Sequence, residues 1–217
     1  MLTKILPSFA LSLMMSTSAN AVPANTPDNI ISSVLDEAYI YDFAYSGGGC
    51  LEGELDAVLT EDGSKVSIFF DNYQADSSAD PRGRSRVTCN MGFALHIPQG
   101  LSVSLIEMDY RGYADIAPGG YGALVADYFF AGDQGLQFIK EWGQPDIWNS
   151  EDFLFENDFL AEAIVWSACG TDEVILRANT SLKAYEGTDN HSFIQLDTVD
   201  ANIALLYHLS WKECPAL

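Results

Sequence analysis

Four cysteines follow an amino-terminal segment that looks like a cleavable leader, and this combination constrains the fold most. They are Cys50, Cys89, Cys169 and Cys214, and none lies in the leader. An even number of cysteines in an exported chain is typical of two disulfides. The pattern therefore predicts an exported, cross-linked domain with a β-rich fold.

The leader has the three parts of a signal peptide. Lys4 gives it a positive start, Ile5–Met15 is mostly apolar, and Ala19-Asn20-Ala21 is a small-residue cleavage site. We therefore expect a signal peptide over residues 1–21, a flexible segment over 22–33 and a single domain over 34–217. The apolar run is shorter than the roughly 20 residues that a membrane span needs. We expect a secreted protein without a membrane span, periplasmic if its host is Gram-negative.

Acidic residues dominate the charge. The chain has 31 Asp and Glu against 10 Lys and Arg, which gives a formal net charge of −21. Phosphate backbones and anionic membrane surfaces are repelled by such a chain, so nucleic acid is not an expected partner. Divalent cations and basic proteins remain compatible with it. The alternative interpretation is an acidic surface that only keeps the protein soluble.

Short alternating segments separated by turn signals predict an all-β fold. The segment from Ile203 to Trp211 alternates apolar and more polar residues, and Val58–Tyr73 has the pattern of a hairpin with its turn at Glu61–Ser64. We expect a two-sheet antiparallel β-sandwich, jelly-roll or Ig-like, with about nine or ten strands. Short helices are expected only over Ile30–Ala38 and Asp158–Val165.

One long strand changes phase in its middle. Before this point Leu101, Val103 and Leu105 share a face, and after it the apolar residues begin again at Ile106. A β-bulge near Leu105-Ile106 restores a single buried face. The same bulge turns four residues together toward the opposite face: Glu107, Asp109, Arg111 and Tyr113.

Several short motifs, in a fixed order, resemble a known family. They are His96-Ile97-Pro98-Gln99-Gly100, Met108-Asp109-Tyr110-Arg111-Gly112-Tyr113-Ala114, Tyr128-Phe129-Phe130, Trp166-Ser167-Ala168-Cys169-Gly170, Asn179-Thr180-Ser181-Leu182 and Leu209-Ser210-Trp211-Lys212-Glu213-Cys214. Together the motifs resemble the secreted family known as domain of unknown function 4360, from about Tyr39 to Cys214. The resemblance implies an exported β-rich domain with four cysteines in these contexts, and it implies no activity. The segment Leu136–Asp152 departs from the family pattern.

The cysteines allow three pairings. We favour Cys50 with Cys89 and Cys169 with Cys214, because each cysteine stands at a strand end and these pairs join neighbouring parts of the chain. No two cysteines have the short spacing of a zinc finger, and no C-x-x-C is present.

The outward face of the bulged strand is the first candidate site. Asp109, Arg111 and Tyr113 have the spacing of a polar recognition patch, although Asp109 and Arg111 can also simply pair beneath Tyr113. Glu107 and Asp109 are expected about 7 Å apart along the strand. This is the carboxylate separation of an inverting glycoside hydrolase.

A second candidate is a row of acids at Glu52, Glu54 and Asp56. On one strand face such a row repels itself unless it is solvated or binds a cation, so calcium is a candidate ligand and a solvated strand edge is the alternative. No other cofactor is expected. The histidines His96 and His191, with His208, fall on three different predicted strands, and their spacing does not indicate a metal site. No G-x-S-x-G or H-E-x-x-H motif occurs.

Two tryptophans form the third candidate. Trp142 and Trp148 flank Gly143 and Pro145 in a stretch, Ile139–Asp152, that we expect to be irregular and exposed. Exposed aromatic rings on loops stack on sugars or anchor in protein partners. The main hypothesis is a non-enzymatic, exported β-sandwich that binds an extracellular glycan or protein. The alternatives are a carboxylate-dependent hydrolase of extracellular polymers and a structural envelope or matrix protein.

Overall fold

The computed structural model describes residues 37–132, 135–158, 164–196 and 204–215. Within them the chain forms twelve strands and one short 3-10 helix, η1 (Ser77–Ala79). The predicted signal peptide and flexible segment, and most of the two predicted helices, lie outside the described residues. No helix in the described part of the chain is long and apolar enough to cross a membrane.

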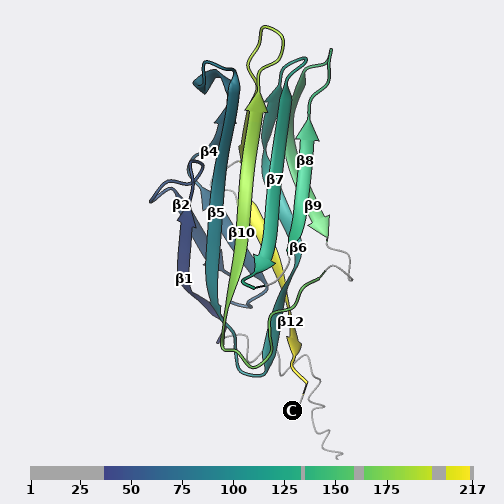
Figure 1. Cartoon of the computed structure of the whole chain (residues 1–217). Helices are drawn as coiled ribbons and strands as arrows, with labels where there is room; N and C mark the ends of the chain where they lie inside the picture. The colour runs from purple at the N-terminus through teal and green to yellow at the C-terminus, as the bar shows by residue number, and fades with distance from the viewer. Residues whose placement is uncertain (1–36, 133–134, 159–163, 197–203, 216–217) are drawn as a thin grey trace, which may run out of the picture.

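The strands form two antiparallel sheets, which confirms the predicted β-sandwich. Figure 1 shows the five strands of the first sheet, sheet A, side by side at the front. In spatial order sheet A consists of β1 (Tyr39–Ser46), β5 (Arg84–His96), β10 (Glu173–Tyr185), β7 (Tyr121–Phe130) and β8 (Leu136–Trp142).

The second sheet, sheet B, lies behind sheet A and has seven strands. Two of them, β4 and β11, have only four residues each and account for the strands beyond the expected ten. In order of hydrogen-bonded neighbours, the sheet contains β2 (Leu55–Leu59), β3 (Lys65–Phe70), β12 (Leu205–Glu213), β6 (Leu101–Ile116), β11 (Phe193–Leu196) and β4 (Tyr73–Asp76). β12 and β11 pair with successive parts of one edge of β6, and β9 (Asn149–Asp158) pairs with its other edge.

The predicted bulge is present in β6. Glu107 faces His208 on β12, while Leu105 faces Leu209, so Ile106 is the additional residue. Beyond the bulge, Met108 and the alternate residues that follow it are buried. The outward residues are therefore those that the sequence predicted: Glu107, Asp109, Arg111 and Tyr113.

The inner faces of the two sheets interlock through aromatic side chains. Phe93 of sheet A meets Tyr207 of sheet B edge-on, with 6.1 Å between ring centroids. Tyr110 stacks on Phe138 at 4.9 Å. These contacts fix the two sheets against each other, because buried aromatic rings supply both large apolar area and specific geometry.

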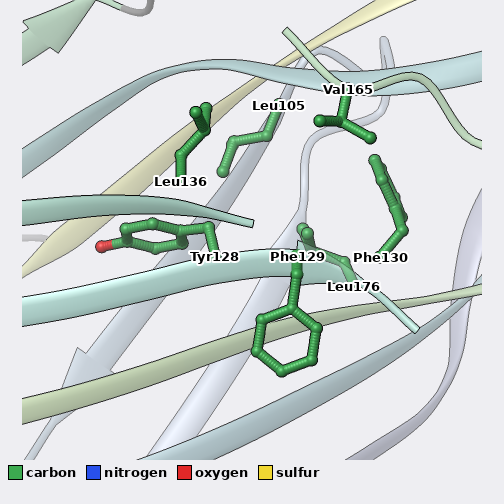
Figure 2. Close-up of a pocket in the computed structure, with 7 residues that line it drawn as sticks. All are labelled: Leu105, Tyr128, Phe129, Phe130, Leu136, Val165 and Leu176. Carbon is green, nitrogen blue, oxygen red and sulfur yellow. The ribbon is translucent and has the colours of Figure 1, made fainter. Parts of the chain in front are cut away.

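A small apolar hollow remains in this core near the carboxyl end of β7. Figure 2 shows Tyr128, Phe130 and Leu105 around it, whereas Phe129 points to the opposite side of its strand. The hollow measures about 20 Å³, which is room for about one water molecule. Because its lining is apolar, we regard it as a packing defect and not as a binding site.

Both predicted disulfides are present. Cys50 pairs with Cys89 and Cys169 pairs with Cys214. The chain reaches Cys50 through Gly47, which has a φ of +145° and lies so close to the Thr88 carbonyl that a Cβ would be 1.9 Å from its oxygen. Only glycine fits this turn.

The predicted hairpin of β2 and β3 turns at residues 60–64, with Gly63 at a φ of +64°. Asp62 holds the turn, because its Oδ1 accepts hydrogen bonds from the hydroxyl of Thr60 at 2.6 Å and from the backbone N–H of Ser64 at 3.0 Å. These bonds, together with one from the Ser64 hydroxyl, lower the pKa of Asp62 from 3.8 to about 2. The carboxylate therefore stabilises the fold above pH 3.8, and this contribution is lost as the pH falls through 2.

We expect Asp62→Asn to reduce the free energy of unfolding by about 0.5 kcal/mol at neutral pH, a small effect because the turn is in solvent. Urea unfolding of both proteins from about pH 7 down to about pH 2 measures the difference. The difference should shrink toward zero below pH 3.8. A difference that persists at the lowest pH would show that the ionised carboxylate is not its source.

Candidate functional site

The outward face of β6 contains a histidine that the sequence did not connect to it. His208 of β12 lies between the two predicted carboxylates. Its Nε2 is 2.9 Å from Oδ2 of Asp109, and its Nδ1 is 3.4 Å from Oε2 of Glu107. One carboxylate thus faces each ring nitrogen, and the contact with Asp109 is a hydrogen bond whose donor depends on the histidine tautomer.

This arrangement bears on two of the sequence hypotheses. The expected pairing of Asp109 with Arg111 is wrong, since Asp109 pairs with His208 and the hydroxyl of Tyr113 hydrogen-bonds to Ser150 at 2.7 Å. Glu107 and Asp109 share one histidine and have similar side-chain exposures, 26% and 19%. A catalytic acid and base need unlike environments, so this geometry does not support the hydrolase hypothesis.

The acidic row predicted for calcium does not form. Glu52 and Glu54 lie in the turn before β2, which begins at Leu55, so only Asp56 is on the strand. The Glu54 carboxylate instead accepts a hydrogen bond from the backbone N–H of Leu51 at 3.2 Å. Among the described residues, metal-ligating side chains come together only at Glu107, Asp109 and His208.

The two tryptophans differ in environment. The irregular stretch is limited to residues 143–148, because β8 continues to Trp142 and β9 begins at Asn149. Trp142 is only 5% exposed, so the expectation that it is exposed is wrong. Trp148 is 44% exposed, and its indole N–H donates to Asp115. A binding role for Trp148 remains a prediction.

Several features of a binding site occur together on a different surface. It lies on the outer face of sheet A, at the end where β10 stops and β5 and β7 begin, which is the upper end of Figure 1. In one row across the sheet Arg84 faces Tyr185, and Tyr185 faces Tyr121. In the next row Arg86 faces Lys183.

The side chains of the first row are in contact. The rings of Tyr121 and Tyr185 are 5.4 Å apart between centroids, and the Arg84 guanidinium lies 5.5 Å from the Tyr185 centroid. The Tyr121 hydroxyl donates to Oε1 of Glu141 at 2.5 Å. Partial desolvation and this carboxylate raise the pKa of Tyr121 to about 12, so the hydroxyl stays protonated.

Two open hollows meet at this surface. One measures about 600 Å³ and the other about 470 Å³, and both are lined by Arg82, Arg84 and Tyr185. We call the combined surface, with Arg86, Tyr121 and the neighbouring Lys183, the basic groove. The volume of each hollow is within the range of ligand sites in proteins.

The arginines of the groove differ in their partners. Arg82 is held by Asp80 through two side-chain hydrogen bonds of 3.0 and 2.9 Å. These bonds lower the pKa of Asp80 to about 2, so the pair stays ionised. Within the described residues, neither Arg84 nor Arg86 has a carboxylate within 4.0 Å. Both guanidinium groups therefore line the groove without an ion-pair partner among these residues, although the Glu186 side chain also lines the second hollow.

Sequence reasoning missed this groove. Arg84 and Arg86 are two residues apart on one strand, as are Lys183 and Tyr185 on another, so each pair points to a single face. This period was visible in the sequence. What the sequence did not show is that β5 and β10, about a hundred residues apart, are neighbours in the sheet.

Two solved structures share a distant likeness with the chain. The structure of TmCBM61 in complex with beta-1,4-galactotriose is 10% identical, with a TM-score of 0.26, and the match covers 80% of this chain and 90% of that one. The family 11 carbohydrate-binding module from Clostridium thermocellum, in complex with a beta-1,3-1,4-mixed-linked tetrasaccharide, is 9% identical, with a TM-score of 0.20 and coverages of 78% and 90%. At these scores the likeness carries no argument about a ligand.

Sequence relatives are more informative. An uncharacterized secreted protein of Arthroderma benhamiae is 27% identical over 183 residues, which are 82% of this chain and 73% of that protein. The secreted relative and the two disulfides agree with the expected location outside the cytosol. A family profile matches residues 36–214, and the chain therefore belongs to the domain of unknown function DUF4360 family.

Proposed function

We propose that the protein is an exported, non-catalytic binding module for extracellular carbohydrate, and that the basic groove is its binding surface. The observation that carries the proposal is the adjoining pair of tyrosines, Tyr121 and Tyr185, in an open hollow of sheet A. Aromatic faces of this kind stack on the apolar faces of sugar rings. Arginine side chains beside them supply hydrogen-bond donors for sugar oxygens.

The placement of these residues favours binding without large rearrangement. Tyr121, Tyr185 and Arg84 all lie on paired strands and not on loops. Side chains on rigid elements lose less conformational entropy when a ligand binds. The cross-linked sandwich is thus a suitable support for a recognition surface.

Affinity electrophoresis through gels that contain soluble polysaccharides, followed by calorimetry on those that bind, tests the proposal. We expect Tyr185→Leu, which removes the ring but keeps an apolar side chain, to weaken binding at least about tenfold, or about 1.4 kcal/mol. Tyr185→Phe should keep most of the affinity, because the ring remains.

Tyr113→Leu is the matched control, since Tyr113 lies on the outer face of sheet B. It should bind like the unmodified protein. If Tyr113→Leu weakens binding and Tyr185→Leu does not, the binding surface is on sheet B. If Trp148→Ala weakens binding and Tyr185→Leu does not, the binding surface includes the segment 143–148. In either case our assignment is wrong. Absence of binding to every polysaccharide would overturn the proposed function itself.

A further inference from the structure

We infer that the carbohydrate bound in the basic groove is an anionic polysaccharide, whose sugars contain carboxylate or sulfate groups. This inference rests on the proposed function and adds the chemical class of the ligand. It is carried by the concentration of cations in the groove of an otherwise acidic protein.

The positive charge is unevenly distributed. The whole chain has only 10 Lys and Arg against 31 acids. Three of these cations, Arg82, Arg84 and Arg86, line the hollows of the groove, and Lys183 faces Arg86 from the adjacent strand. Arg82 is paired with Asp80, and Glu186 also lines one hollow. Among the described residues, the cations of the groove without a carboxylate partner are therefore Arg84, Arg86 and Lys183, which lie together at one end of one sheet face.

The pair formed by Arg86 and Lys183 is the most specific indication that the groove binds an anion. The two residues are directly opposite each other on β5 and β10. Like charges in this position destabilise a sheet, since their Cβ atoms are only about 5 Å apart. Within the described residues neither side chain has a carboxylate partner within 4.0 Å. An anionic group bound between the two side chains relieves this repulsion.

The neighbouring groups extend the site along the sheet. Arg84 is two residues from Arg86 on the same face, about 7 Å away along the strand. Its guanidinium lies 5.5 Å from the centroid of the Tyr185 ring, and both residues line the two hollows of the groove. Guanidinium groups bind carboxylate and sulfate oxygens in pairs, and an adjacent tyrosine ring stacks on the sugar. The combination fits a chain of charged sugars better than an isolated anion.

The net charge of −21 does not prevent such binding. At physiological ionic strength, charges farther apart than about 8 Å are largely screened from each other. A ligand in the groove therefore interacts mainly with the nearest cations. Affinity should consequently fall as salt is added.

Matched pairs of polysaccharides that differ only in charge test the inference by calorimetry. Polygalacturonate is compared with its methyl ester, and dextran sulfate with dextran. We expect the charged member of at least one pair to bind at least about tenfold more tightly, or by about 1.4 kcal/mol. The pair that shows the difference identifies the anionic group as carboxylate or sulfate. Raising sodium chloride from about 0.05 M to about 0.5 M should weaken this binding.

Variants then locate the charge. Arg86→Ala combined with Lys183→Ala should weaken binding of the charged polymer at least about tenfold. Its melting temperature should be unchanged or higher, because a like-charge contact is removed. Arg177→Ala is the control. Arg177 is an exposed cation on β10, the strand of Lys183, but it lies outside the groove.

Each other outcome is decisive. If neutral and charged polymers bind equally well, the carbohydrate function stands and the inference is wrong. If no polysaccharide binds, both are wrong. If polyglutamate binds as tightly as the charged polysaccharides, the groove recognises polyanions such as acidic proteins, and the inference about sugars is overturned. If Arg177→Ala weakens binding of the charged polymer as much as the double variant does, the effect of charge is nonspecific and the cations of the groove are not the binding site.

Discussion

Replacing Cys50 and Cys89 together by alanine is expected to lower the free energy of unfolding by about 4 kcal/mol. The cysteines are 39 residues apart in the sequence, and closing a loop of this length restricts the unfolded chain by about that amount in the chain-entropy model. Both residues are also buried, at 2% and 0% exposure, so their packing contributes in the same direction. A loss of this size is a large part of the stability of a typical domain.

Urea unfolding, followed by tryptophan fluorescence and circular dichroism, measures this effect. The matched control replaces Cys169 and Cys214, which close a loop of similar length, 45 residues, and of which Cys169 is exposed. We expect this replacement to lower the free energy of unfolding by a similar or slightly smaller amount, since Cys169 is exposed and its removal costs less packing. A loss below about 1 kcal/mol for the first pair would contradict the view that these cross-links restrict the unfolded chain.

The sequence was most informative where one strand contains its own pattern. The change of phase near Leu105-Ile106 predicted the bulge, and with it the common face of Glu107 and Asp109. The hairpin turn at residues 60–64 was likewise visible, because its turn residues and the alternation after it are local. The disulfide pairing followed from the proximity of cysteines along the chain. All these features depend on contacts between residues that are near in sequence or on strand periodicity.

Contacts between strands were not visible in the same way. His208 and Asp109 are 99 residues apart, and their 2.9 Å contact depends on the pairing of β12 with β6. The basic groove depends in the same way on the pairing of β5 with β10 and of β10 with β7. Single-strand periodicity assigns a residue to a face, but it does not show which residue of another strand lies beside it.

Errors occurred where a local pattern had two explanations. Glu52, Glu54 and Asp56 alternate as in a strand, but Gly53 has a φ of +86° and the chain turns there before β2. The irregular stretch predicted over Ile139–Asp152 is too long at both ends, because only residues 143–148 lie between β8 and β9. The residues before Gly143 alternate between the two faces of β8, and this weak alternation is the local sequence signal of the strand.

The net charge illustrates a further limit of composition. A value of −21 argues against polyanions as partners when the charge is averaged over the molecule. The fold, however, brings Arg84, Arg86 and Lys183 to one end of sheet A. Because electrostatic interactions in salt solution are short-ranged, this local arrangement has more effect than the total charge on the electrostatic potential at that end of the sheet.

Trp142→Ala is expected to lower the free energy of unfolding by about 4 kcal/mol, while the same change at Trp148 should cost about 1 kcal/mol or less. The Trp142 ring packs against Phe153 at 5.1 Å and Phe155 at 5.8 Å between centroids, and its N–H donates to Glu151 at 2.6 Å. It therefore joins β8 of sheet A to β9 of sheet B. Removing it leaves a cavity between the two sheet edges.

Urea unfolding of the two single variants distinguishes the two environments. Trp148 is the matched control, because it is the same residue type six positions away and is 44% exposed. Equal losses for both variants would show that Trp142 does not connect the sheets as described. Trp142→Phe should recover most of the stability, since a smaller ring still fills much of the space against Phe153 and Phe155. A variant of Trp142 that weakens carbohydrate binding is therefore to be interpreted only after its stability has been measured, whereas Trp148→Ala tests binding on a folded protein.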